Sequence, residues 1–197
     1  MRVIAGSAKG RRLESVPGES TRPITDRVKE SLFNILSPEI VGARVLDLFG
    51  GTGAVGIEAL SRGAEHAVFV ELDRHALRTI GHNLQATGLS ERARVVRGDA
   101  FKYLQTAGEG FDIIYIAPPQ YKEMWARALL ALDARPLLRA GGVAVVQIAP
   151  KEWHAVELSR LELTDERRYG TTLLLFFRLA LTPDTPAADP PADVPAA

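Results

Sequence analysis

The 197-residue chain contains no cysteine, which excludes disulfides and thiolate metal sites and is consistent with a reducing compartment. It has 24 Lys and Arg residues against 24 Asp and Glu residues, so no net charge attracts a polyanion to the whole surface. No apolar run reaches the length of a membrane-spanning helix, and no signal-peptide pattern is present. We therefore expect a soluble, cytoplasmic protein.

Histidine is also scarce, and the spacing of the four histidines relative to acidic residues does not predict a metal site. We expect no metal. Apolar residues nevertheless make up 46% of the chain, which is enough for one substantial core. The charge is unevenly distributed, since residues 1–12 contain four basic side chains and no acid.

The most informative stretch is an apolar run, residues 45–49, that contains a single acid, Asp47. It is followed by the turn Gly50-Gly51-Thr52-Gly53 and then by an apolar pattern with helical spacing. This order predicts a buried strand, a tight turn and the first turn of a helix. Because glycine has no Cβ, such a turn allows a ligand to approach the backbone closely. We therefore predict a site for a nucleotide cofactor.

Two cofactors are compatible with this turn. Residues 51–56 match the pattern G-x-G-x-x-G, and Glu71 follows at the offset of a ribose-binding acid, which permits NAD and a dehydrogenase. However, Asp47 precedes the turn, where its carboxylate would repel a diphosphate. The same carboxylate suits a ligand with a positive centre and an amino group. S-adenosylmethionine has both and carries no phosphate, so we favour it as the cofactor.

Acidic residues also follow the next two predicted strands. Glu71 can accept hydrogen bonds from both ribose hydroxyls, whereas Asp73 is better placed to cap the helix predicted at residues 74–86. Asp99 follows the strand at residues 93–97 and can accept from an adenine amino group, cap the helix at residues 100–106, or do both. The predicted cofactor-binding residues are Asp47, Phe49, Gly51, Thr52, Gly53, Glu71, Leu72, Asp99 and Ala100.

The fourth predicted strand, residues 111–116, is followed by a proline pair. Two prolines at the end of a strand fix a rigid turn that cannot continue the hydrogen-bond ladder. Ligands of open α/β sheets bind outside the carboxyl ends of the strands. The candidate catalytic residues are therefore those of this turn: Ala117, Pro118, Pro119, Gln120 and Tyr121.

From residue 43 the predicted strands and helices alternate, which indicates an α/β fold with a doubly wound, mostly parallel sheet. A helix at residues 121–132 is expected to lead, after the break at Gly141-Gly142, into a fifth strand at residues 143–148. The runs 161–169 and 171–181 meet at Gly170, too close for a crossover, so they must be antiparallel. A seven-stranded Rossmann-like sheet with an antiparallel last strand is typical of class I methyltransferases.

We divide the chain into three parts. Residues 1–42 form an N-terminal extension, with a basic hairpin or arm at residues 1–16 and a helix that begins after Thr25. Residues 43–181 form the methyltransferase core. Residues 182–197 are rich in proline and alanine and are expected to be disordered.

A further stretch, outside the methyltransferase core, carries a family resemblance. Residues 22–36, RPITDRVKESLFNIL, are close to the pattern R-P-T-x-D-R-V-[RK]-E-x-L-F-N-x-L, and residues 47–53, DLFGGTG, parallel D-L-F-[AG]-G-[ST]-G. The chain thus resembles the RsmD-type bacterial methyltransferases over residues 1–181. The resemblance implies transfer from S-adenosylmethionine to the guanine N2 amine of small-subunit (16S) ribosomal RNA, with that RNA or the small subunit as partner. We expect a monomer.

The chain departs from this family at the proline turn. The family usually has Asp or Asn before the proline pair and an aromatic residue directly after it, whereas this chain has Ala117 before the pair and Tyr121 one place later. In the family, the acid or amide accepts a hydrogen bond from the target amine, and the aromatic ring stacks on the flipped base. Ala117 offers no acceptor, so we expect the Pro118 carbonyl to hold the amine, with Gln120 Oε1 as a substitute, and Tyr121 to stack.

Clustered basic residues near the N-terminus are the predicted contacts to RNA phosphates: Lys9, Arg11, Arg12, Arg22 and Arg27. Arg22 and Arg27 can instead pair with Asp26 and Glu30 and brace a lid over the cofactor. Besides the dehydrogenase, two alternatives to an RNA methyltransferase remain open. One is an amino-methyltransferase acting on DNA, and the other is a catalytically impaired, cofactor-binding RNA-binding or assembly factor.

Overall fold

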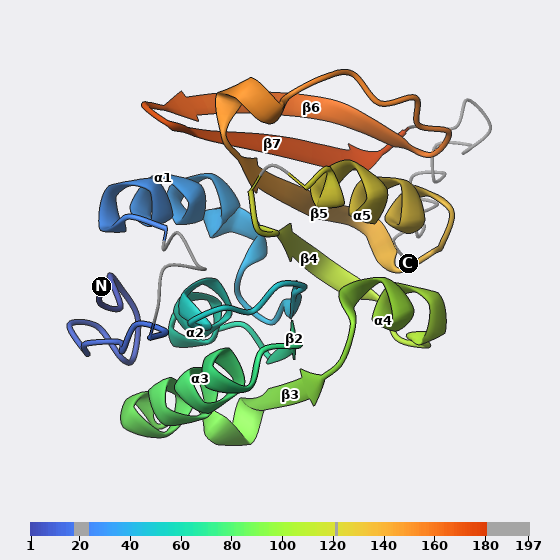
Figure 1. Ribbon diagram of the computed structural model, residues 1–197. Helices are drawn as coiled ribbons and strands as arrows, with labels where there is room; N and C mark the ends of the chain where they lie inside the picture. The colour runs from blue at the N-terminus through green and yellow to red at the C-terminus, as the bar shows by residue number, and fades with distance from the viewer. Residues whose placement is uncertain (18–23, 121, 181–197) are drawn as a thin grey trace, which may run out of the picture.

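The computed structural model describes residues 1–17, 24–120 and 122–180. Its centre is a seven-stranded sheet in the order β3-β2-β1-β4-β5-β7-β6 (Figure 1). The strands are β1 (Arg44–Asp47), β2 (His66–Glu71), β3 (Ala93–Arg97), β4 (Phe111–Ile116), β5 (Leu138–Ile148), β6 (Leu161–Tyr169) and β7 (Thr172–Leu179). Strands β1 to β5 are parallel, and β7 is antiparallel to both β5 and β6. The predicted fold class is confirmed.

Helices cover both faces of the sheet: α1 (Asp26–Leu36), α2 (Ala54–Ser61), α3 (Arg74–Thr87), α4 (Ala100–Thr106) and α5 (Met124–Asp133). The described residues also form three short 3-10 turns: η1 (Ser37–Glu39), η2 (Ser90–Arg92) and η3 (Pro150–Glu152). Figure 1 shows α1, α2 and α3 on one side of the sheet and α4 and α5 on the other. Successive strand residues point to opposite faces of the sheet and pack into two hydrophobic cores, with Val45 in the first and Leu46 in the second.

Three predicted helix starts are confirmed by side-chain caps. Thr25 Oγ1 accepts from the Val28 amide at 3.3 Å at the start of α1. Asp73 caps α3 by accepting from two amides at 2.9 Å, and Asp99 caps α4 by accepting from the Lys102 amide at 2.9 Å. Each cap satisfies backbone donors that the first turn of a helix leaves without partners. The two aspartates therefore fix where the chain turns away from the sheet beside the predicted site.

Several predicted boundaries were wrong. Helix α5 begins at Met124, because the preceding residue, Glu123, adopts a left-handed conformation with φ +51° that ends the loop after the prolines. Strand β5 begins at Leu138, so the glycine pair lies inside a strand. There, Gly141 adopts φ +76°, and the pairing of β4 with β5 shifts register. Strand β1 ends at Asp47, which places Phe49 in the turn. The predicted disordered tail, residues 182–197, lies outside the described residues.

The N-terminal arm, residues 1–13, forms a single antiparallel bridge between Arg2 and Arg12 and shares the core of α1, α2 and α3. It is held by Glu58 of α2, whose carboxylate accepts from the Ile4 amide at 2.8 Å and pairs with Lys29 at 3.1 Å. Both side chains of this pair are 0% exposed, and burial lowers the pKa of Lys29. The arm is therefore anchored by a buried ion pair that its sequence did not reveal.

Candidate active site

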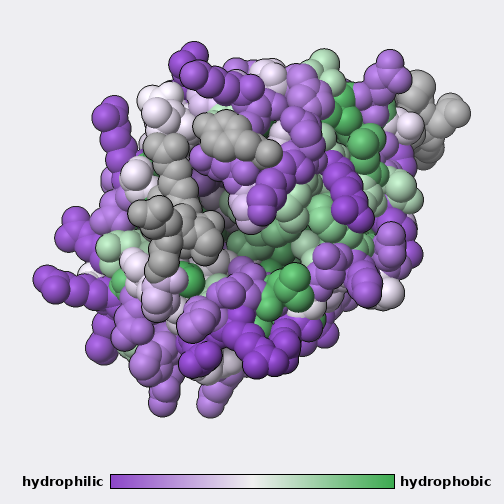
Figure 2. Space-filling model, in the orientation of Figure 1, coloured by the Kyte–Doolittle hydropathy of each residue, from purple (hydrophilic) through white to green (hydrophobic). Residues whose placement is uncertain are grey.

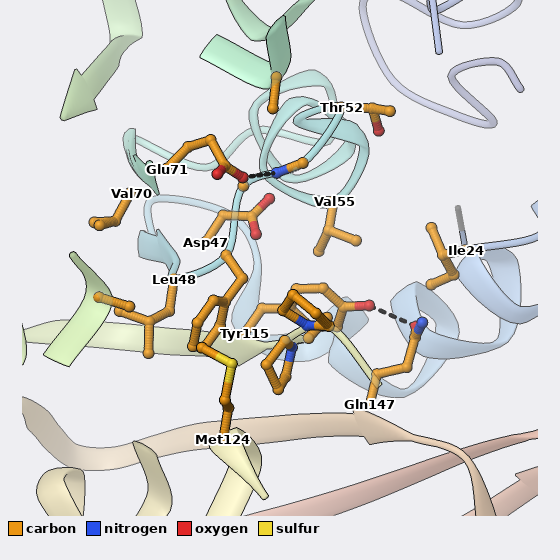
Figure 3. A pocket seen from close by; sticks show the side chains of 18 of the residues that line it. Ile24, Asp47, Leu48, Thr52, Val55, Val70, Glu71, Tyr115, Met124 and Gln147 are labelled. Atoms are coloured by element: carbon orange, nitrogen blue, oxygen red, sulfur yellow. Dashed lines mark hydrogen bonds between the residues drawn. The ribbon is translucent and has the colours of Figure 1, made fainter. Parts of the chain in front are cut away.

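A cavity of about 740 Å³ lies at the carboxyl ends of β1, β2, β4 and β5 (Figure 3). This volume is in the range of small-molecule sites. On the face shown in Figure 2, a hollow with an apolar floor is bordered by hydrophilic side chains. The cavity is lined by every predicted catalytic residue that the structure describes and by every predicted cofactor-binding residue except Gly53. Gly53 instead precedes α2 and takes φ +75°.

Asp47, at the end of β1, is only 2% exposed. Its Oδ2 accepts from the Gly56 amide at 3.2 Å. Burial raises the pKa of Asp47 to about 7, against the effect of this amide and reinforced by the nearby charge of Glu71. A buried carboxylate is stabilised in its charged form by a cation and destabilised by another anion. The site therefore suits a positively charged ligand and not a diphosphate.

The glycine turn also argues against a dinucleotide, because the backbone amides of its three glycines already have partners. Gly50 N donates to Val70 O at 3.0 Å, Gly51 N to Glu71 Oε2 at 2.9 Å, and Gly53 N to Gly50 O at 2.7 Å. A pyrophosphate-binding turn needs such amides free to face the ligand. A Cβ at Gly56, the last glycine of the matching pattern, would lie 2.3 Å from the Phe69 ring, so this glycine lets α2 pack closely on β2 and does not discriminate between the two cofactors.

Glu71 lies at the end of β2, across the turn from Asp47 (Figure 3). Besides the Gly51 amide, it accepts from the Leu72 amide at 2.7 Å and from the Asp73 amide at 2.9 Å. These contacts hold the carboxylate at the cavity wall. Because carboxylate oxygens can accept several hydrogen bonds, the predicted contact with ribose hydroxyls remains compatible with this position.

The cavity wall near the start of α4 combines apolar side chains with one acid, Asp99. Leu72 is 62% exposed beside the cavity, and the ring of Phe101 packs edge-on against Phe49 with 6.2 Å between centroids. The Arg127 guanidinium lies 3.8 Å from the Phe101 centroid. Asp99 lines the same region through the turn that caps α4. Sequence reasoning missed Phe101, although its place directly after Asp99 and Ala100 is a usable signal.

The proline turn lines the same cavity as Asp47 and Glu71. Ala117, Pro118, Pro119 and Gln120 all line it, whereas Tyr121 lies outside the described residues. The stacking role of Tyr121 therefore stays a prediction. The structure adds Tyr115 and Gln147, which the sequence did not single out. Both residues line the cavity, and the Tyr115 hydroxyl donates to Gln147 Oε1 at 2.5 Å (Figure 3).

Helix α1 and the residues just before it lie beside this cavity. Ile24, Thr25 and Val28 contribute to its wall. The predicted RNA contacts that the structure describes are exposed: Lys9, Arg11, Arg12 and Arg27. Arg22 lies outside the described residues. Asp26 pairs with Arg2 at 3.4 Å, and no ion pair joins Arg27 to Asp26 or Glu30, so Arg27 does not form the alternative brace.

Two absences apply to the part of the chain that the structure describes. No three His, Cys, Asp or Glu side chains gather closely enough there to hold a metal ion. No helix there combines the length and the apolar character needed to cross a membrane.

A doubly wound sheet closed by the β6–β7 hairpin, with two acidic residues and a proline turn around one crevice, defines a class I methyltransferase. Enzymes of this class take their methyl group from S-adenosylmethionine. The family model described as "Conserved hypothetical protein 95" matches residues 1–178. The chain belongs to this family.

Named relatives agree with this assignment. The "Putative rRNA methyltransferase YlbH" of Bacillus subtilis (strain 168) is 43% identical over 182 residues, which cover 90% of this chain and 98% of the relative. The "Ribosomal RNA small subunit methyltransferase D" of Haemophilus influenzae is 32% identical, with 86% and 93% covered. A solved structure, "Putative methyltransferase yhhF from Escherichia coli", has a TM-score of 0.81, 33% identity, and 91% and 97% coverage. The resemblance to the RsmD type is thereby confirmed.

Proposed function

We propose that this enzyme transfers the methyl group of S-adenosylmethionine to the N2 amine of a guanine in small-subunit ribosomal RNA. The observation that carries the proposal is that the proline turn lines the same cavity as Asp47 and Glu71. A donor held by the acids would thus lie beside a target held by the turn. The names of relatives that match most of the chain support ribosomal RNA as the substrate.

The cofactor pose follows from the charges and acceptors around the cavity. Asp47 would face the positive end of the cofactor, and Glu71 the ribose hydroxyls. Asp99 would accept from the adenine amino group while it still caps α4. The remaining predicted contacts line the cavity around the ligand: Phe49, Gly51, Thr52, Leu72 and Ala100.

The main requirement of the reaction is to position the guanine amine against the methyl group. A guanine amine is a poor nucleophile because its lone pair is delocalised into the ring, so the enzyme must direct that lone pair at the sulfonium methyl group. The new N–C bond forms as the S–C bond breaks, and the nitrogen then loses a proton. In this account the Pro118 carbonyl accepts from the amine, with Gln120 Oε1 as a substitute, and Tyr121 stacks on the base.

The RNA must present its guanine outside the base stack, which costs least in single-stranded or loop regions. The basic arm and helix α1 pack into the same core on one face of the sheet. They carry four of the predicted phosphate contacts, Lys9, Arg11, Arg12 and Arg27, and Arg22 remains a predicted contact outside the described residues. Action as a monomer is part of the proposal. A ribosomal substrate supports a cytoplasmic location for this activity.

A methyl-transfer assay tests the proposal. Unmodified small subunits, naked small-subunit RNA and duplex DNA are each incubated with the enzyme and labelled S-adenosylmethionine, and the nucleosides are then separated. We expect label in N2-methylguanosine from RNA or subunits. Label in a DNA base would favour the DNA amino-methyltransferase. Cofactor binding without transfer to any substrate would favour the assembly factor and refute the proposal.

A further inference from the structure

A side-chain pair stands beside the proline turn at the place where the family's acidic or amide residue is missing. Tyr115 belongs to β4 and precedes the turn by two residues, and Gln147 lies near the end of β5. The Tyr115 hydroxyl donates to Gln147 Oε1 at 2.5 Å, and both residues line the cavity. Figure 3 shows this hydroxyl directed at the Gln147 amide.

The strand register puts Gln147 level with position 117. Tyr115 pairs with Val145, and Ile116 with Val146, so Gln147 comes level with Ala117 one residue further along the parallel strands. Residues two apart in a strand share a face of the sheet. Tyr115 is also the register partner of Asp47 on β1. The Gln147 amide therefore lies on the cofactor side of the turn, next to the small Ala117 side chain.

The target amine needs two acceptors. Its nitrogen carries two N–H groups, and both must be held if the lone pair is to point at the methyl group. The Pro118 carbonyl accounts for one, and Ala117 has no polar side-chain atom for the other. Gln147 Oε1 has two lone pairs, of which the Tyr115 hydroxyl occupies one.

Building on the proposed function, we propose that Gln147 is a catalytic residue whose Oε1 accepts a hydrogen bond from the target guanine amine in place of a side chain at position 117. Tyr115 is the positioning residue that fixes the Gln147 amide. Burial raises the pKa of Tyr115 well above its usual value, which keeps its hydroxyl protonated and able to donate. Gln147 is neutral and takes no proton, so the proton leaves the methylated nitrogen for solvent water.

Gln120 is the competing acceptor on the turn. Its side chain forms no hydrogen bond with any residue that the structure describes, so binding would have to order it. Gln147 is already oriented by Tyr115, and an acceptor oriented in advance lowers a barrier more effectively. The structure therefore favours Gln147 over Gln120.

The test compares kcat on unmodified small subunits for four single variants, Gln147→Leu, Tyr115→Phe, Gln120→Leu and Gln105→Leu. Gln105 on α4 is exposed and lies outside the cavity, so its variant is the matched control and should retain wild-type kcat. We expect Gln147→Leu to lower kcat by about 100-fold, the usual cost of removing one preorganised hydrogen bond to the reacting group. Calorimetric affinity for S-adenosylmethionine should stay at the wild-type value.

A second background separates a catalytic role from a structural one. Ala117→Asn restores an amide at the turn, so the loss caused by Gln147→Leu should become several-fold smaller in that background than in the wild type. An equal loss in both backgrounds, or unchanged kcat in Gln147→Leu, would overturn the inference, as would a loss confined to Gln120→Leu. An inactive wild-type enzyme that still binds the cofactor would instead refute the proposed function, and the inference with it.

Discussion

The buried carboxylate of Asp47 should make cofactor binding depend on pH. Asp47 is 2% exposed, and burial is the main cause that raises its pKa to about 7. A sulfonium or ammonium group placed beside it favours the charged form and lowers that pKa. S-adenosylmethionine should therefore bind the ionised form more tightly, and its affinity should fall as the pH falls through 7.

The size of the effect follows from the pKa of about 7. If the bound state keeps Asp47 ionised, the apparent Kd rises about tenfold at pH 6 and about 100-fold at pH 5 relative to pH 8. The stability of the protein without added cofactor depends on pH in the opposite sense. The folded pKa of Asp47 is about 7, above the ordinary value of 3.8. Its contribution to the free energy of unfolding is therefore complete below pH 3.8 and is lost as the pH rises through 7. The difference corresponds to roughly 4 kcal/mol.

Calorimetric titration of S-adenosylmethionine between pH 5 and pH 8 measures the effect in wild type and in Asp47→Asn. The amide keeps an oxygen acceptor for the Gly56 amide, 3.2 Å from Asp47 Oδ2 in the wild type, and removes only the charge. Titration of the ligand's own groups is common to both proteins. Asp47→Asn should bind weakly with little pH dependence and unfold at higher urea concentration at pH 8. Equal pH slopes in the two proteins would refute the reasoning.

Three further predictions concern the frame and the RNA contacts. Glu58→Gln leaves a buried lysine without its counter-charge and should cost about 3–5 kcal/mol in urea unfolding, whereas the exposed control Glu65→Gln should change stability by less than about 0.5 kcal/mol. Gly56→Ala would place a Cβ 2.3 Å from an aromatic ring and should cost about 1–3 kcal/mol, while Gly81→Ala, with no atom within 4 Å, should stabilise by about 0.5–1 kcal/mol; equal effects would contradict the packing account. Charge reversal at three exposed residues of the arm, Lys9, Arg11 and Arg12, should weaken RNA binding and leave cofactor affinity unchanged. The slope of log affinity against log salt concentration should fall by about 0.7–0.9 per lost phosphate contact. An unaltered slope would exclude the arm from the interface.

Local signals in the sequence were sufficient for most of the fold. Asp73 and Asp99 are capping residues next to periodic apolar runs, and both helix starts were correct because the cap and the helix are adjacent in the chain. The antiparallel hairpin followed from the short link at Gly170. The start of α5 was missed because a left-handed conformation is unusual for a glutamate and no local pattern marks it at Glu123. The Glu123 carboxylate also contacts His154 Nε2 at 2.8 Å, across 31 residues of sequence.

The site was predictable where it depends on strand ends and hidden where it depends on register. Asp47, Glu71 and the proline turn each follow a recognisable apolar run, and parallel strands bring such ends together. The hydrogen bond from Tyr115 to Gln147 joins two strands, and no local pattern specifies which residues face each other across them. The ion pair of Lys29 with Glu58 was missed for the same reason, because its two residues come from different helices.

Mass mapping of small-subunit ribosomal RNA from cells that lack this protein tests the central claim most directly. The account predicts that one guanosine loses a single methyl group relative to the parent strain, and that supplying the wild-type chain restores it. An RNA whose methylation pattern is identical in the two strains would contradict the account.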